Sequence, residues 1–157
     1  MKKVDLLSAA KTVLTLIIFA GIFTACSNST SADEDEHGDA EGFRLIMNGQ
    51  TVVEQLPDED LTGEFELVTG QETDLITIVF IDHDGEEFTP DEDELSLGYE
   101  FEDSGIAEFE QHDEDGKWSF HIHAEAEGIT DLRLMLMHSG HSDFTSQNIH
   151  VHVEAAE

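Results

Sequence analysis

Cysteine is nearly absent from this 157-residue chain, because Cys26 is the only one, and no disulfide can form within a single molecule. Proline occurs twice, tryptophan once and tyrosine once, and six basic side chains face 37 acidic ones. The resulting formal charge of −31 repels other polyanions. We therefore expect neither nucleic acid nor an anionic membrane surface to bind the chain through charge.

The short motifs of common enzyme classes are missing as well. The chain contains no Gly-x-Ser-x-Gly, no glycine-rich phosphate loop and no His-Glu-x-x-His. Carboxylates are abundant, but none of them is singled out as an acid/base pair. We therefore expect a protein that is not an enzyme.

The first 25 residues have the organisation of an export signal. Lys2 and Lys3 precede an apolar run over 13–23 that is too short to span a bilayer comfortably. The ending Thr24-Ala25-Cys26 resembles a bacterial lipobox. This predicts a lipoprotein signal peptide at 1–25, with Cys26 as the lipidated end that anchors the protein to a membrane of the cell envelope, facing the periplasm or the exterior. A free thiol or an intermolecular disulfide at Cys26 is the alternative.

Two segments follow the signal. Residues 26–42 are rich in Ser, Asp, Glu and Gly, a composition that predicts a disordered acidic tether. Residues 43–157 are enough for one domain with a core of its own. Beyond residue 25 the chain has three basic and 36 acidic side chains, a charge of −33. Such a surface suits solubility at high salt, as in a halophilic protein, and it also attracts cations.

Period-two alternation dominates the expected domain. Short strands are predicted where apolar residues alternate between turn signals, and they cover approximately 43–47, 50–55, 64–68, 74–81, 95–101, 106–110, 118–124, 132–137 and 149–153. The last two read as a hairpin with Leu132, Leu134 and Leu136 facing inward. No stretch outside the signal shows helical periodicity. These features predict an all-β fold, a single Ig-like antiparallel β-sandwich.

Four motifs carry a resemblance to bacterial Ig-like domains of the group 2 type. They are Leu67-Val-x-Gly70-x-Glu-Thr-x-Leu, Gly105-Ile-Ala-Glu-Phe, Gly116-x-Trp-x-Phe, and Glu125-Ala-Glu-Gly128-Ile-Thr-x-Leu. The resemblance covers roughly 67–153 and implies an Ig-like sandwich in an exported protein. It implies no chemistry, and the His138-Ser-Gly-His141 loop is not part of the family pattern.

Histidine is concentrated near the end of the chain, where seven of the nine fall between His112 and His152. If alternate strands of the sandwich end on one side, three loops meet there. They would bring together Asp82, His83 and Asp84; His112, Asp113 and Asp115; and His138, His141 and Asp143. Imidazole and carboxylate ligands at about 2.0–2.2 Å suit a divalent transition ion. The alternative is that these polar side chains simply occupy surface loops.

Two His-x-His pairs and one Met-x-Met pair are further candidates. His121 with His123, and His150 with His152, should each point outward from a strand, and the sandwich topology assigns the two pairs to different sheets. Met135-x-Met137 beside His150 and His152 would suit Cu(I), because thioether is a soft ligand. The structural alternative is that the methionines cover the core.

These patterns predict a lipid-anchored extracytoplasmic protein that captures, buffers or passes on a transition metal ion, zinc or copper, through histidines. A metal transporter or receptor would be its partner. The alternative is a non-enzymatic Ig-like interaction or adhesion module without metal. Calcium is a third hypothesis, because Asp82-His-Asp-Gly85 and Asp113-Glu-Asp-Gly116 are oxygen-rich turns without EF-hand spacing.

Overall fold

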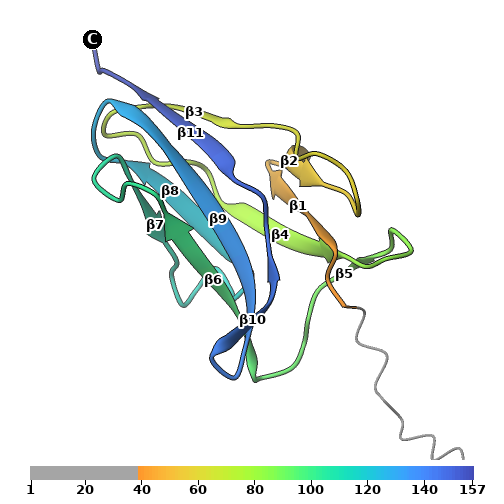
Figure 1. The fold of residues 1–157 in the computed structure, drawn as a ribbon. Coiled ribbons are helices and arrows are strands. Elements are labelled where there is room, and N and C mark those ends of the chain that lie inside the picture. Colours follow the sequence, from red (N-terminus) through yellow and green to blue (C-terminus); the bar gives the residue numbers. More distant parts are fainter. Residues whose placement is uncertain (1–38) are drawn as a thin grey trace, which may run out of the picture. The chain divides into compact units, whose positions relative to one another are not determined.

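Alternating apolar and polar residues form eleven strands in residues 39–157, the part of the chain that the computed structural model describes (Figure 1). The strands are β1 (Gly42–Met47), β2 (Gln50–Gln55), β3 (Phe65–Val68), β4 (Ile76–Ile81), β5 (Glu87–Phe88), β6 (Leu95–Phe101), β7 (Ala107–Glu110), β8 (Ser119–Ala124), β9 (Gly128–His138), β10 (His141–Thr145) and β11 (Ile149–Glu154). Within 39–157 there is no helix of the length and apolarity needed to cross a membrane.

The strands form two sheets. The first has the order β2-β1-β4-β8-β7, with β5 added to β4, and the second has the order β10-β9-β11-β3, with β6 added to β9. The expected all-β sandwich is confirmed, and β4 is central, as its two apolar faces predict. The pairing is antiparallel with one exception, since β3 and β11 run parallel.

Side chains from the inner faces of both sheets fill the core. On β9 the three leucines Leu132, Leu134 and Leu136 are buried, while Arg133 between them is exposed, as the alternation predicts. Met135 and Met137 occupy the outer face and are half-buried. Gly98 of β6 lies beneath Met137, and a Cβ there would come within 2.7 Å of the Met137 side chain. The methionines therefore cover β6.

The hairpin expected over 129–153 differs from the observed one. β9 is longer than expected, and its return is split into β10 and β11, which pair with successive parts of the same edge. Ser146 lies between them, and its Oγ accepts a 2.9 Å hydrogen bond from the Leu134 backbone N–H. Ile149 is therefore opposite Leu132, at the middle of β9.

The first contacts of the sandwich precede β1, which begins at Gly42. Ala40 packs against the core and the Glu41 N–H donates to Ile81 O at 2.8 Å, so the sandwich includes the last residues of the expected tether. The signal peptide, Cys26 and the rest of the expected tether up to residue 38 lie outside the described residues.

Candidate metal centres

The hairpin of β7 and β8 builds a group that we call the β8 triad: His112, Asp115 and His121. Glu110 and His121 are opposite each other where the hairpin opens. The Gln111 side-chain amide closes the loop by donating to Lys117 O and Ser119 O, both at 3.0 Å. Inside the loop the Asp115 N–H donates to His112 O at 3.0 Å. This turn brings His112 and Asp115 back toward the outer face of β8.

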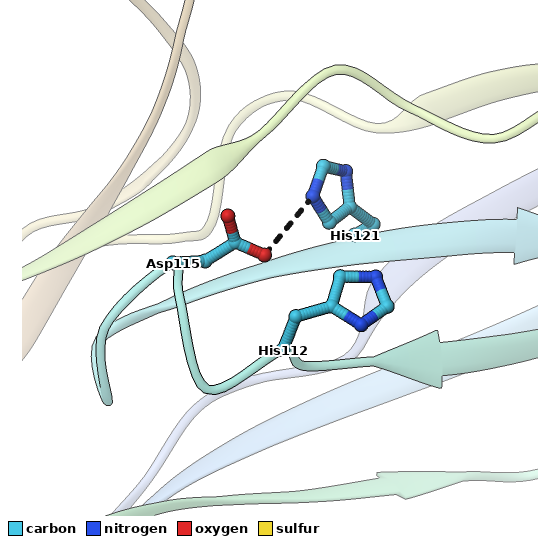
Figure 2. A group of neighbouring side chains, drawn as sticks. All are labelled: His112, Asp115 and His121. Carbon is cyan, nitrogen blue, oxygen red and sulfur yellow. Dashed lines mark ion pairs between the residues drawn. The ribbon is translucent and has the colours of Figure 1, made fainter.

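The three side chains of the β8 triad converge (Figure 2). His121 Nε2 and Asp115 Oδ2 are 3.6 Å apart, and the rings of His112 and His121 have centroids 5.7 Å apart. One ligand atom from each residue lies within 4.8 Å of the other two. Neighbouring ligands of a tetrahedral zinc ion, at bond lengths of 2.0–2.1 Å, are about 3.3 Å apart. The Asp115–His121 distance is close to this value, and the ligand atom of His112 lies within 4.8 Å of both.

The orientation of His121 is set by the segment that covers it. His121 Nδ1 is 2.9 Å from Thr73 O, and because a carbonyl only accepts, this contact assigns the hydrogen to Nδ1. In the neutral imidazole, Nε2 then presents its lone pair to Asp115. Thr73 is itself fixed, since its Oγ1 accepts from the Ile122 N–H at 3.0 Å. A ligating histidine held through its other nitrogen is typical of metal sites.

Asp115 Oδ2 is the oxygen that faces this lone pair. It is buried and has no hydrogen-bond donor within 39–157, and 3.6 Å is too long for a hydrogen bond to His121. The contact is an ion pair only when His121 is protonated, and a buried anionic oxygen without a hydrogen-bond donor is costly. A cation between Oδ2 and Nε2 would satisfy both atoms.

A second group, the hairpin triad, comprises His138, His141 and Asp143 at the β9–β10 turn. His138 and His141 are a cross-strand pair, and Ser139 and Gly140 between them both have positive φ, 48° and 91°. A register shift between Ser142 and Phe144 leaves Asp143 unpaired in a bulge. The tight turn and the bulge together bring the three side chains to one side.

Each oxygen of Asp143 in the hairpin triad faces a different imidazole. Oδ2 is 3.3 Å from His138 Nδ1, and Oδ1 is 3.1 Å from His141 Nε2. His138 Nε2 lies 3.3 Å from Glu94 Oε2, which comes from the β5–β6 connection. These side chains are between 40% and 73% exposed, whereas His121 is 14% and Asp115 19% exposed. The hairpin triad is thus an open site and the β8 triad a half-buried one.

The single apical centre expected from four histidines is divided. His112 lies in the β8 triad, and His138 and His141 lie in the hairpin triad. His83 is in the β4–β5 turn, which Figure 1 shows apart from the β9–β10 hairpin, and its Nε2 is 3.2 Å from Asp84 Oδ2. The reason is register, because β8 begins opposite Thr77 and β4 continues four residues beyond it, about 13 Å at 3.3 Å per residue.

Asp82 has a structural role in the β4–β5 turn. Its Oδ1 accepts hydrogen bonds from the backbone N–H groups of Asp84 and Glu86, both at 2.9 Å. Asp82 and Asp84 join neither triad. The oxygen-rich turn predicted as a calcium candidate is thus explained by its own backbone hydrogen bonds.

The two His-x-His pairs lie in different sheets, as expected, and the two rings of each pair have different neighbours. His123 Nδ1 is 2.8 Å from Glu125 Oε1, while His121 belongs to the β8 triad. The hydrogen bond to Glu125 raises the pKa of His123 above its ordinary value, helped by the charges of Glu110 and Glu72 and opposed by desolvation.

His150 is held by Asp131, with Nδ1 and Oδ1 2.5 Å apart, and Asn148 donates to the other Asp131 oxygen at 2.8 Å. His152 is opposite Ile129 and is exposed. Met135 is opposite Thr145, four residues along β9 from the partner of His150. That separation is about 13 Å, so the expected Met and His set for Cu(I) is not assembled.

The sequence placed Asp115 and Asp143 beside histidines in the expected loops but did not single them out among the carboxylates there. It gave no signal for Glu94, which lies in an acidic run that resembles many others in this chain. The β7–β8 hairpin was the signal that could have identified Asp115. A strand pair that places His121 opposite Glu110 also brings the loop residues back over His121.

Comparison with known proteins yields only distant structural likenesses. No protein-family model matches the chain, and no curated protein matches it. Over 68% of its length the chain is similar to a structure of domains 4 and 5 of the S-layer protein SbsC, at 15% identity and a TM-score of 0.40. Over 67% it is similar to domains 5–6 of SbsC, at 16% identity and a TM-score of 0.40. The chain spans 53% and 44% of those structures.

Proposed function

We propose that this chain is a lipid-anchored extracytoplasmic protein that captures, buffers or passes on a transition metal ion through histidine and aspartate side chains. The observation that carries the proposal is the meeting of Asp115 Oδ2 and His121 Nε2. A buried carboxylate oxygen without a donor faces an imidazole nitrogen whose hydrogen is committed elsewhere. A metal cation between the two atoms would give both of them a partner.

Zinc is the first choice of ion and copper the second. Two imidazoles and one carboxylate suit Zn(II), and three protein ligands leave a fourth position for water or an incoming ligand. An open position distinguishes such a site from a closed structural zinc site. Cu(II) accepts the same nitrogen and oxygen donors, whereas the separation of Met135 from His150 removes the support for Cu(I).

The proposal is tested by elemental analysis and calorimetric titration of the full chain in detergent with Zn(II) and Cu(II). His121→Ala should weaken the tightest binding at least tenfold, which corresponds to about 1.4 kcal/mol. His152→Ala is the matched control, because this imidazole is exposed and belongs to neither triad. Failure of the wild-type chain to bind either ion at micromolar concentration near neutral pH would end the proposal.

The membrane part of the proposal depends on the lipobox-like Thr24-Ala25-Cys26. Expression in a bacterial host should yield a mature chain that begins at a lipid-modified Cys26, detectable as an added acyl mass. Cys26→Ser should move the protein from the membrane fraction to the soluble exported fraction. A lipid anchor would be contradicted if the wild-type protein were as soluble as the Cys26→Ser variant and the variant were found in both fractions as an unprocessed precursor.

The second candidate function is a non-enzymatic module of the bacterial Ig-like type that contacts a protein or polysaccharide. Its support is the outer face of β9 and β3, where Ile129 is 67% and Val68 39% exposed. In this case the titration detects no ion, and Ile129→Ser weakens capture of the partner while the triad variants do not.

A further inference from the structure

A short acidic segment touches the surroundings of both triads. This segment, which we call the acidic strap, is Pro90–Glu94 in the connection from β5 to β6. At one end, Trp118 Nε1 donates to Pro90 O at 2.8 Å and Lys117 Nζ to Glu92 O at 2.6 Å. Lys117 and Trp118 close the loop that holds His112 and Asp115. The strap is thus fixed to the β7–β8 loop.

At its other end the acidic strap reaches the β9–β10 hairpin. The Ser139 N–H donates to Glu94 O at 3.5 Å, and Glu94 Oε2 is 3.3 Å from His138 Nε2. If His138 donates through Nε2 to Glu94, its Nδ1 lone pair faces Asp143. Glu94 is therefore a positioning residue for the hairpin triad, as Thr73 is for the β8 triad. Figure 1 shows the β5–β6 connection and the β9–β10 hairpin at the same end of the sandwich.

The two triads differ in what an ion would replace. In the hairpin triad both oxygens of Asp143 already have an imidazole nitrogen within 3.3 Å, so an incoming ion must separate Asp143 from two neighbours. In the β8 triad an ion separates Asp115 from one neighbour only, His121 Nε2 at 3.6 Å, and gives a partner to a buried oxygen that has no hydrogen-bond donor within 39–157. Solvent also reaches the hairpin triad more easily, because its three side chains are 40–66% exposed, whereas in the β8 triad His112 is 50% exposed but Asp115 and His121 are only 19% and 14% exposed. The β8 triad should therefore bind an ion more tightly, and the hairpin triad should exchange its ion faster.

We propose that the two triads form an ordered pair for divalent transition ions. The β8 triad retains one ion tightly, and the hairpin triad, positioned by Glu94, takes up and releases a second ion quickly. The strap holds both sites at one end of the domain. This inference rests on the proposed function and adds to it the number of sites, their order of filling and the role of each.

The test uses Co(II), whose visible absorption reports nitrogen and oxygen coordination, and the full chain in detergent. Titration should show two steps per chain that differ at least tenfold in affinity. Release into excess EDTA by stopped flow should then show a slow and a fast phase. His121→Ala and Asp115→Asn should each remove the slow phase, and His138→Ala with His141→Ala should remove the fast one.

Glu94→Gln separates positioning from ligation. It keeps a hydrogen-bond acceptor for His138 but removes the charge, so it should speed the fast phase several-fold and leave the slow phase unchanged. His152→Ala should change neither, and circular dichroism should show that each variant keeps its strands. Equal phases, one ion per chain, or a fast phase that is lost with His121 would overturn the ordered pair while the proposed function survives. A wild-type chain that binds no ion would overturn both.

Discussion

The β8 triad and the hairpin triad use the same three ligands, two histidines and one aspartate, and differ in what surrounds them. In the β8 triad a buried threonine carbonyl fixes one imidazole, and a carboxylate oxygen remains without a donor. In the hairpin triad every carboxylate oxygen has a nearby imidazole, and solvent surrounds the group. Similar residues can therefore form either a half-buried group with a fixed imidazole or an open, exposed group, and the contacts around the three side chains decide which.

The largest expected effect is that of pH on metal binding. An imidazole must lose its proton to bind an ion, and its ordinary pKa is about 6.5. With two imidazoles in each triad, zinc affinity should fall at least tenfold between pH 7.5 and pH 5.5, because protons compete with the ion for both nitrogens. Isothermal titration at both pH values measures this. A flat profile would instead indicate binding by carboxylates alone, as in the calcium hypothesis.

Trp118→Phe should have the next largest effect, because it breaks the attachment of the acidic strap. The buried indole N–H donates to Pro90 O, and its loss leaves that carbonyl without this donor. Urea denaturation should show a loss of about 1–2 kcal/mol in the free energy of unfolding. Tyr99→Phe is the control, since Tyr99 is 49% exposed and keeps its ring on Phe109. Equal losses in both variants would contradict a specific role for the strap contact.

Charge removal at the two aspartates should give effects of opposite sign in the metal-free protein. Asp115→Asn removes the facing negative charge and can donate to His121 Nε2, so the free energy of unfolding should rise by about 0.5–1 kcal/mol. Asp143→Asn loses two exposed ion pairs and should lower it by about 0.2–1 kcal/mol. Chemical denaturation in EDTA measures both. If Asp115→Asn destabilises the metal-free protein, the comparison between the triads fails.

The smallest effect concerns His123, which lies outside both triads. Because its pKa is raised by Glu125, the pair stabilises the folded state fully below the unfolded pKa of about 6.5 and loses this contribution as the pH rises through the higher folded value. His123→Gln should cost a few tenths of a kcal/mol at pH 5.5 and nothing at pH 8.5. Thermal melts at low salt test this, and 0.5 M NaCl should weaken it. A cost at pH 8.5 would point to packing instead.

Much of the fold could be predicted from the sequence because alternation is a local signal. The Asn48-Gly49 turn and the inward leucines of β9 follow from residues a few positions apart. The two-residue β5 and the parallel pairing of β3 with β11 could not be predicted, since one is too short to alternate and the other joins segments far apart in the chain.

The candidate sites also differ in whether a local sequence pattern predicts them. His138 and His141 were identifiable because one tight turn joins them. The pairing of Asp115 with His121 depends on the conformation of an eight-residue loop and on cover from Thr73, which no local pattern encodes. The single apical centre failed because strand register, which the sequence does not specify, displaces the β4–β5 turn.

The parallel pairing of β3 with β11 also has a kinetic consequence. It joins residues 65–68 to residues 151–154, so the second sheet has two unpaired strand edges until residues 149–154 are available. Contacts of such long sequence separation form slowly. A nascent chain would therefore stay open and prone to aggregation until its last strand emerges, and a version cut before Ile149 should fail to fold rather than fold with reduced stability.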